Sequence, residues 1–399
     1  MTTQPRFIQI HTLHTYPAAL INRDDAGLAK RLPLGSAMRT RISSQCLKRH
    51  WRIADDPFAL AELKVPMAVR SRGTLESIRK GIMEGGISEP LAQAAAEALR
   101  DGGLVDKAGK AIKGEDALKT GQAVLMGRAE IDYLVRRCIE LAQENADAAA
   151  IKTAVLKMLK DEKQNITALK HGSGLESALF GRMVTSDVLA ARDAAVYVAH
   201  AFTVHEAQVE NDYFTVVDDL LQETGELGSA GIFDTELASG LYYGYVVVDV
   251  RQLVENLEGI AAKECFDKDT PPERRALTGQ VVEHLIHLIA TVSPGAKRGS
   301  TAPFDWAKFM LVEAGDWQPC SLAGAFHDAL PLSAPDRQSN RARAVASLSS
   351  EISKMDAAYG ATVTRRVMAL DPVEVPNAQR VNLNDLAQWA ADCIVQGAC

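Results

Sequence analysis

Residues 22–52 read NRDDAGLAKRLPLGSAMRTRISSQCLKRHWR, and this stretch carries the strongest signal for the fold and function of the chain. It contains eight lysine or arginine residues and two aspartates, a local charge of +6. The whole chain of 399 residues carries a net charge of −7, so the rest of the sequence is strongly acidic. A cationic segment in an acidic protein indicates a local anion site rather than a generally basic surface.

The second half of this stretch has the periodicity of an amphipathic helix. We expect RISSQCLKRHWRIA to be helical, with Ser43 or Ser44 as the cap. One face then carries Gln45, Lys48, Arg49 and Arg52. The opposite face carries Leu47, Trp51 and Ala54, which suits packing on a core. Such a helix can offer cations and backbone N–H groups to phosphates. A solvated basic face on an ordinary amphipathic helix is the alternative.

Several side chains are candidates for binding phosphate. The cationic candidates in the stretch are Lys30, Arg31, Arg39, Arg41, Lys48, Arg49 and Arg52. Ser43, Gln45 and the N–H groups at the start of the helix add neutral donors. A further cation, Lys297, lies in the sequence GAKRG, where glycine lets the backbone approach a phosphate. An exposed lysine in an ordinary turn is the alternative interpretation of Lys297.

Residues 203–239 form a second segment of interest. Its apolar side chains stand beside acidic residues, and the sequence ETGELGSAGIF that follows them contains no lysine or arginine. Such a segment cannot bind a phosphate backbone by charge, but it can insert between bases or dock on a neighbouring subunit. The alternative is that DYFTVV is a buried core strand, because apolar alternation usually indicates burial.

Composition limits the class of protein. With 47% apolar and 24% charged residues, the chain resembles an ordinary soluble globular protein. No apolar run reaches the roughly 18 residues needed to span a bilayer, and the N-terminus lacks the features of a signal peptide. The six cysteines are scattered without a C-x-x-C pair, so we expect core or tail thiols in a reducing cytoplasm and no structural zinc.

The periodicities predict an α+β fold. Strands are expected at FIQIHTL from Phe7, at SALFGRMV, at Leu241 to Val250 and at WAKFMLVEA. Helices are expected in the basic segment, at residues 271–292 and 381–398, and throughout an alanine-rich block from about 55 to 170. The order strand, helix, strands, helix, strand is that of a ferredoxin-like βαββαβ unit. The alanine-rich block is then a helical insertion.

The residues from Phe7 to Arg52 closely resemble the start of the CasC family, the repeated backbone subunit of the type I-E CRISPR surveillance complex called Cascade. The matching text is FIQIHTL, then LINRDD, then RTRISSQCLKR. The resemblance resumes at ALFGRM (178–183), DAAVYVAHAFTVHEA (193–207), ENDYFTVVDDL (210–220), SGLYYGYVVVD (239–249) and, more loosely, SPGAKRGSTAP (293–303).

This resemblance implies a domain organisation. A modified ferredoxin-like (RRM-like) palm is expected from residues 1–55 and 171–399. Residues 56–170 are the helical fingers insertion, and residues 203–239 are a protruding thumb loop that reaches across the guide RNA.

The resemblance also implies site residues. It selects Lys30, Ser43, Gln45, Lys48 and Arg49 as RNA contacts within the basic stretch. In the thumb it selects Phe214, Thr215 and Val217, with Met183 of the FGRM block on the other side of the RNA. With Arg39, Arg41, Arg52 and Lys297 from the charge pattern, these residues make up the expected RNA-binding site.

The implied function is binding rather than catalysis. The subunit is expected to hold CRISPR guide RNA through phosphates and sugars, without regard to sequence, so that the bases stay free to pair with a target DNA strand. Copies of the chain are expected to polymerise head-to-tail along the RNA and to join other Cascade subunits in antiviral defence. No cofactor and no metal are expected.

A competing interpretation is a metal-dependent ribonuclease. Relatives of this fold in type III CRISPR complexes cut guide-paired RNA with a backbone aspartate, and Asp24 and Asp25 follow the first strand close to the basic segment. Ion pairing with the adjacent Arg23 is the simpler account of the two acids.

Histidines give no stronger signal for catalysis. His284 and His287 have helical spacing beside Glu283, but apolar residues surround them, so a core or interface pair is expected rather than a metal site. His200 and His205 have no spaced partner for acid–base cleavage. A nucleotide-dependent enzyme is disfavoured because no G-x-G-x-x-G or P-loop motif is present.

Overall fold

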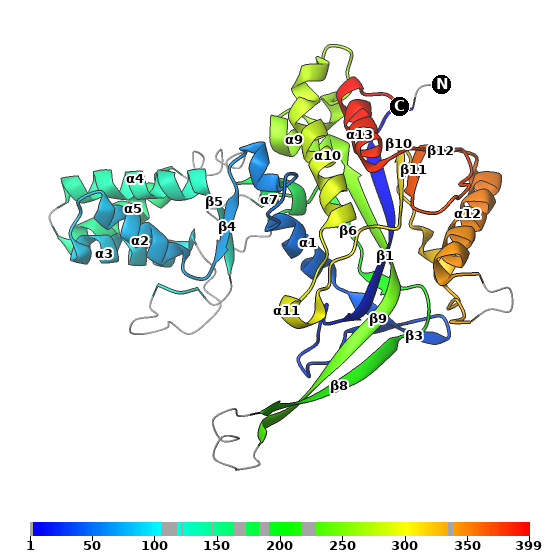
Figure 1. Ribbon diagram of the computed structural model, residues 1–399. Coiled ribbons are helices and arrows are strands. Elements are labelled where there is room, and N and C mark those ends of the chain that lie inside the picture. The colour runs from blue at the N-terminus through cyan, green and yellow to red at the C-terminus, as the bar shows by residue number, and fades with distance from the viewer. Residues whose placement is uncertain are drawn as a thin grey trace. The chain divides into compact units, whose positions relative to one another are not determined.

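The chain folds into two compact units. The computed structural model describes residues 3–104, 118–120, 123–145, 147–162, 173–182, 191–217, 229–333 and 338–399 (Figure 1). The first unit consists of Met1–Leu60, Tyr197–Val250 and Lys268–Cys399, and the second unit consists of Ala61–Val196 and Arg251–Asp267. The expected helical insertion, residues 56–170, overlaps the second unit, which also takes in residues 171–196 and 251–267.

A large, mainly antiparallel sheet forms the frame of the first unit. Its described strands follow the order β12-β11-β10-β1-β9-β7-β3-β2. They are β1 (Phe7–Ala19), β2 (Arg31–Leu34), β3 (Ala37–Ile42), β7 (Ala201–Thr203), β9 (Ser229–Asp249), β10 (Phe309–Gly315), β11 (Thr364–Ala369) and β12 (Ala378–Arg380). Neighbours are antiparallel, except that β11 and β12 run parallel.

β1 is the central strand, and it confirms the first predicted strand. It pairs with β9 from Phe7 opposite Asp249, and on its other edge with β10 from Phe7 opposite Gly315. Residues 7–14 are all buried because both faces of the strand are covered. A strand buried on both faces tolerates a nearly continuous apolar run, as FIQIHTL provides.

Helices cover the two faces of this sheet. On one face, Leu13 of β1 and Phe309 of β10 share a core with α12 (Asn340–Tyr359) and the short 3₁₀ helix η7 (Leu322–Phe326). On the other face, His14 of β1 lines a small cavity with Trp51 of α1 (Ser44–Arg52) and Ile289 of α10 (Ala276–Thr291). α13 (Leu383–Gln396) packs beside α10 (Figure 1). The predicted terminal helix and the predicted strand at WAKFMLVEA are thereby confirmed.

β9 is unusually long, and its two halves have different partners. Its second half lies in the main sheet beside β1, whereas its first half pairs with β8 (Gln208–Val217), from Gln208 opposite Ser239 to Val217 opposite Ser229. We call this pair, residues 208–217 and 229–239, the arm; Figure 1 shows it extending beyond the strands of the main sheet. The expected thumb is therefore a two-stranded ladder in its described part, not a loop.

The second unit is mainly helical. Its elements are β4 (Ala68–Ser71), α2 (Thr74–Glu84), α3 (Glu89–Leu99), the π-helical turn η2 (Arg100–Leu104), β5 (Val124–Gly127), α4 (Arg128–Glu144), α5 (Ala148–Asp161), α7 (Leu175–Phe180) and most of α9 (Val250–Glu258). Alanines of α3 pack with leucines and isoleucines of α2, α4 and α5 in one core, as the alanine-rich sequence predicts. β4 and β5 form a two-stranded sheet that the sequence analysis missed.

One strand prediction in the second unit is wrong. SALFGRMV was expected to be extended, but Leu175–Phe180 is helical. Gly174 and Gly181, with φ of 90° and 77°, bound the helix, and a side chain at Gly174 would meet the backbone of Ala68. Short apolar runs fit a buried strand or a buried helix equally well, so these glycines decide the outcome.

The remaining short elements connect these parts. They are η1 (Leu60–Leu63), β6 (Val196–Val198), η5 (Ala262–Glu264), η6 (Pro272–Arg275) and α11 (Arg298–Thr301). No helix within the described ranges is both long and apolar enough to cross a membrane.

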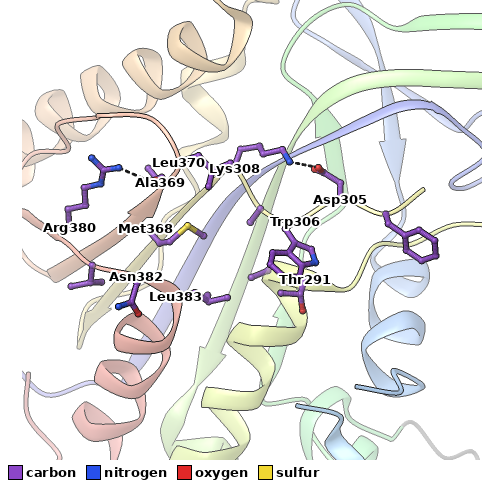
Figure 2. Close-up of a pocket in the computed structure, with 14 residues that line it drawn as sticks. Thr291, Asp305, Trp306, Lys308, Met368, Ala369, Leu370, Arg380, Asn382 and Leu383 are labelled. Carbon is purple, nitrogen blue, oxygen red and sulfur yellow. Dashed lines mark hydrogen bonds and ion pairs between the residues drawn. The ribbon is translucent and has the colours of Figure 1, made fainter. Parts of the chain in front are cut away.

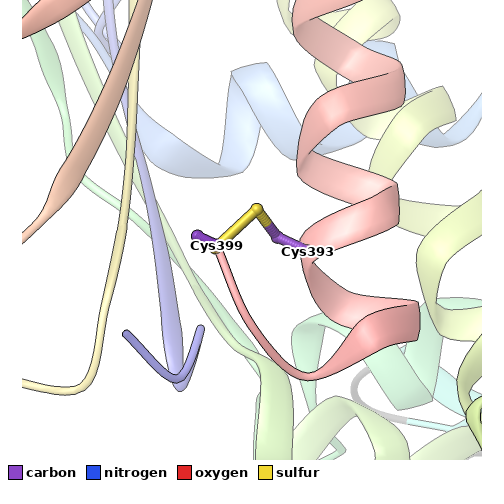
Figure 3. Close-up of a disulfide and its surroundings, with 2 residues drawn as sticks. All are labelled: Cys393 and Cys399. Atoms are coloured by element: carbon purple, nitrogen blue, oxygen red, sulfur yellow. A yellow bond between two sulfur atoms is a disulfide. The ribbon is translucent and has the colours of Figure 1, made fainter. Parts of the chain in front are cut away.

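The C-terminus corrects the expectation that all six cysteines are thiols. A disulfide joins Cys393 on α13 to Cys399 (Figure 3). Gly397 ends the helix in the left-handed conformation, with φ of 72°, and the chain turns back so that the two Cα atoms lie 4.9 Å apart. The backbone N–H of Cys399 also donates to the carbonyl of Thr3, which ties the two ends of the chain together.

Candidate nucleic-acid interface

The basic helix α1 is built as the sequence predicts. The Ser43 hydroxyl accepts a hydrogen bond from the N–H of Cys46, which caps the helix, and Trp51 is buried on the apolar face. Gln45 and Arg49 are exposed, while Lys48 and Arg52 are partly covered. Burial lowers the pKa of Lys48. The Ser43 side chain is itself buried and engaged as the cap, and the N–H of Ser44, the next residue, donates to His200.

The basic loop, residues 22–31, is tied to the start of this helix. Asn22 holds both ends of the connection, because its side-chain oxygen accepts from the N–H of Ser43 at 2.8 Å and its carbonyl accepts from the N–H of Lys30 at 3.0 Å. Asp24 closes a turn by accepting from the N–H of Leu28 at 2.9 Å. Lys30 is thus placed beside the helix cap, whereas Asp24 serves the internal geometry of the loop.

Arg39 corrects the expected site. Its side chain is fully buried, and its guanidinium donates to the carbonyls of Thr203 at 3.0 Å and Phe326 at 3.1 Å. Burial lowers its pKa. Along β3 the charged Arg39 is buried and the apolar Met38 is exposed, whereas a hydrophobic pattern predicts the opposite. Arg39 therefore holds β3 against β7 and η7 and cannot reach a phosphate.

Arg41, two residues further on, remains at the surface beside a histidine. Its Nη1 donates to Nδ1 of His200 at 3.4 Å, and the N–H of Ser44 donates to the same nitrogen at 3.3 Å. Partial burial, together with the charges of Arg41 and Lys30, lowers the pKa of His200. The imidazole is then a neutral acceptor at neutral pH, and the sequence analysis did not place His200 in the basic site.

A histidine on α1 links the helix to a second basic segment. His50 donates from Nδ1 to the carbonyl of Cys46 at 2.8 Å, and its Nε2 accepts from the N–H of Gly295 at 3.3 Å. Gly295 lies in the glycine loop, residues 294–303, which also contains Lys297. His50 was not a predicted site residue, and a lone histidine within a basic helix gives no sequence signal for such a link.

Lys297 in turn contacts the arm. Its ammonium lies 5.3 Å from the centre of the Phe214 ring and donates to the hydroxyl of Thr235 at 3.3 Å. Phe214 is 37% exposed and Tyr213, its neighbour, is 64% exposed, so neither is a core residue. Alternation along a strand puts these two rings on opposite faces of the arm. The buried-strand alternative for DYFTVV is therefore wrong at these two positions.

Three other predicted RNA contacts lie partly or wholly outside the described part of the structure. Thr215 and Val217 lie on β8, opposite Ile232 and Ser229, and their side chains fall outside the described part of the structure. Met183 lies outside the described residues altogether.

The basic loop also contacts the arm, through an acid. Glu236 on β9 accepts from Arg31 Nη2 at 2.5 Å with one carboxylate oxygen and from the N–H of Ala29 at 2.8 Å with the other. Arg31, a cation of the predicted phosphate site, is therefore paired within the chain.

The ribonuclease alternative requires a group of metal ligands. Among the described residues, no group of three or more histidine, cysteine, aspartate or glutamate side chains lies close enough to hold a metal ion. His287 is buried and stacks on Phe58 with ring centres 3.5 Å apart, and His284 lies 3.1 Å from the Phe58 carbonyl through Nδ1. These histidines form an internal packing pair, as expected.

A cavity of about 900 Å³ lies elsewhere on the first unit, between the end of α10, β11 and the start of α13 (Figure 2). Its lining is mostly apolar, and Trp306 is 69% exposed at its edge. The polar groups there have partners within the chain, since Lys308 pairs with Asp305 and Arg380 donates to the Ala369 carbonyl. None of the predicted site residues lines this cavity.

Comparison with known proteins gives a consistent result. The profile of the CT1975-like protein family, a Cas family, matches residues 8–391. A solved chain titled "CRISPR RNA-guided surveillance complex, pre-nicking" is 27% identical, with a TM-score of 0.77 over 97% of this chain and 100% of that one. Another, titled "CRISPR RNA-guided surveillance complex", is 24% identical, with a TM-score of 0.67 over 97% and 99%, and shares the fold. No curated protein sequence matches.

Proposed function

The chain belongs to the CT1975-like protein family, and we propose that it is a guide-RNA-binding backbone subunit of a CRISPR surveillance complex of the Cascade kind. In this proposal it holds guide RNA without regard to sequence and presents it for pairing with a target DNA strand in antiviral defence. The resemblance to the CasC family of type I-E complexes supports this proposal.

One structural observation carries the proposal. The basic helix α1 and the arm are joined through the glycine loop, because His50 on α1 bonds Gly295, and Lys297 of the same loop contacts Phe214. Cations and helix N–H groups suit phosphates, whereas an exposed ring on a projecting arm suits insertion between bases. Both contacts are indifferent to base identity, as a subunit that accepts any guide sequence requires.

The fold of the first unit supports the same assignment. Its strands β10, β1, β9 and β7 lie side by side in that order, all antiparallel, with α1 and α10 on one face. In a ferredoxin-like βαββαβ unit the four strands have the same spatial order: fourth, first, third and second along the chain. We therefore propose that the first unit is a modified ferredoxin-like palm.

Assembly is the second part of the proposal. A subunit that repeats along one RNA must use a head-to-tail contact, which gives an open filament whose length the RNA sets. The acidic balance outside the basic stretch would limit stray RNA binding and could meet a basic patch on the next copy. The remaining partners are other Cascade subunits, and the compartment is the cytoplasm.

We propose no catalytic role. The ribonuclease alternative needs Asp24 or Asp25 to hold a metal ion, and one of the two oxygens of the Asp24 carboxylate accepts the Leu28 N–H within its own turn. Chemistry on the target is then left to other proteins.

The test is to purify the protein after expression alone and measure absorbance at 260 and 280 nm, followed by electron microscopy. Co-purified RNA in helical assemblies is the expected result. Protein that is free of RNA, and that fails to bind added single-stranded RNA at low salt, would contradict the proposal.

A further inference from the structure

Glu236 is an acid of the arm that contacts the basic loop. It lies on β9 opposite Asn211 of β8, and its side chain is only 7% exposed. Both carboxylate oxygens are used, one by the backbone N–H of Ala29 and one by Arg31. An acid that lowers the local positive charge opposes the electrostatic part of phosphate binding, so its presence calls for a different role.

The two contacts of Glu236 bracket a predicted RNA contact. Ala29 and Arg31 are the residues immediately before and after Lys30. The backbone of Lys30 is meanwhile fixed to Asn22 and to Arg41 by hydrogen bonds of 3.0 and 2.7 Å. The main chain of Lys30 is therefore held on both sides. Among the described contacts, Glu236 is the only side chain of the arm that bonds residues 29–31.

The residue next to Glu236 holds the other basic segment. Thr235 accepts from the ammonium of Lys297 at 3.3 Å. Consecutive residues of a strand point to opposite faces, so this short piece of β9 grips the basic loop on one face and the glycine loop on the other. The position of the arm is thereby linked to two cationic segments that are more than 250 residues apart in sequence.

We propose that Glu236 is a positioning residue for RNA binding, which fixes Lys30 relative to the arm so that phosphate contact and base insertion occur in one register. This inference rests on the proposed function. We call the contacts of Glu236 with Ala29 and Arg31 the clamp. In this inference Arg31 belongs to the clamp and does not bind a phosphate.

The electrostatic effect and the positioning effect of Glu236 predict opposite changes in RNA affinity for the substitution Glu236→Gln. Glu236→Gln removes a negative charge from a cationic surface, so electrostatics alone predicts tighter RNA binding, most clearly at low salt. The amide can still accept from Ala29, but its NH₂ group would face the Arg31 guanidinium, donor against donor, so the contact with Arg31 is lost while the contact with Ala29 remains. Positioning therefore predicts weaker binding, on the order of tenfold, the factor that corresponds to one charge-assisted hydrogen bond.

The experiment compares four proteins in RNA binding at two salt concentrations: wild type, Glu236→Gln, Glu236→Ala and Glu210→Gln. Glu210 is the matched control, because it is exposed on the same arm opposite Leu237 and the substitution makes the same charge change. Each is also combined with Lys30→Ala. If Glu236 acts through Lys30, the Lys30→Ala loss should be clearly smaller in the Glu236 variants than in the wild type.

Hydrogen exchange of the RNA-free proteins supplies a readout independent of RNA. The Ala29 amide should exchange faster in Glu236→Ala, while Glu236→Gln and Glu210→Gln leave it protected. Unchanged protection in Glu236→Ala, or Glu236→Gln binding as tightly as Glu210→Gln, would overturn the inference while leaving the proposed function in place. A wild type that binds no RNA would instead overturn both.

Discussion

The Nε2 atom of His50 accepts a hydrogen bond from the backbone N–H of Gly295, at 3.3 Å, and this contact joins the basic helix to the glycine loop. The same imidazole donates from Nδ1 to the Cys46 carbonyl at 2.8 Å. One histidine side chain therefore bonds the backbone of its own helix with one ring nitrogen and the backbone of the glycine loop with the other.

The cationic face of α1 should account for phosphate binding. Changing Lys48 and Arg49 together to Ala should weaken binding of all RNA sequences alike and flatten the salt dependence by about one to two units in the log–log slope. The matched control is Lys268→Ala with Lys354→Ala, two exposed lysines of the same unit outside the basic stretch. Equal slopes for the two double variants, measured by titration at several salt concentrations, would remove α1 from the interface.

Arg39 should behave as a structural residue. Arg39→Met leaves the carbonyls of Thr203 and Phe326 without their buried donor, and we expect a loss of about 2–4 kcal/mol in the free energy of unfolding. RNA affinity per folded molecule should stay close to that of the wild type. Urea unfolding and RNA titration on the same samples decide the matter; a stable variant with weak RNA binding would return Arg39 to the site.

His14 should make stability depend on pH. Burial lowers its pKa from 6.5 to about 4; the charge of Asp305 opposes this shift, and the charge of Lys308 acts in the same direction as burial. The unfolded chain takes up a proton below pH 6.5 while the folded protein does not, so stability falls as the pH drops from 6.5 to 4 and this contribution then levels off. Between pH 7 and pH 5 the contribution is about 2 kcal/mol.

The measurement for His14 is urea unfolding of the wild type and of His14→Gln at both pH values. The difference in unfolding free energy between pH 7 and pH 5 should shrink by about that 2 kcal/mol in the variant. The comparison between proteins is needed because His205 and His287 also have pKa values lowered by burial. An identical pH dependence in both proteins would mean that His14 is solvated in the folded state.

The protein should not cut RNA. We predict that single-stranded RNA complementary to a bound guide remains intact in Mg²⁺ or Mn²⁺, because one oxygen of the Asp24 carboxylate is engaged with the Leu28 N–H in its own turn. Gel analysis with Asp25→Ala as the comparison checks this. Regularly spaced products from the wild type that disappear in the variant would favour the ribonuclease alternative.

Local signals explain which parts of the site were predictable. The helix α1 follows from a Ser43 cap and apolar residues at helical spacing, all within ten residues of sequence. Arg39 could not be placed, because its burial depends on carbonyls of residues 203 and 326, which only the tertiary fold brings to it. The clamp formed by Glu236 is likewise a contact across more than 200 residues, and an isolated glutamate on a strand has no distinguishing pattern.

The same reasoning applies to the fold. The apolar run of β1 and the long helix α10 are periodic over enough residues to be read from sequence. The length of β9 was not foreseen, since its first half is polar enough to resemble a loop and gains its strand geometry from pairing with β8. The disulfide was missed because it depends on the left-handed turn at Gly397, not on the spacing of the cysteines alone.

Phe214 should contribute to RNA binding through its ring and not through charge. Phe214→Ala should cost on the order of 1–3 kcal/mol of binding free energy per subunit, the size of a lost base contact, with the salt dependence unchanged. Removing a core phenylalanine would cost about 3–5 kcal/mol of unfolding free energy. The Phe214 ring is 37% exposed, so we expect only a small decrease in the melting temperature of the RNA-free protein.

Tyr213→Ala is the matched control for Phe214, since it removes a more exposed aromatic from the opposite face of the same strand. Lys297→Ala distinguishes insertion of the Phe214 ring between bases from a role in which the ring only supports Lys297. If Phe214 only supported Lys297, Lys297→Ala would weaken RNA binding as much as Phe214→Ala. Adding Phe214→Ala to Lys297→Ala would then cause no further loss of affinity. If the ring inserts between bases, the double variant should lose more affinity than either single variant, and the salt slope should change only where Lys297 is removed.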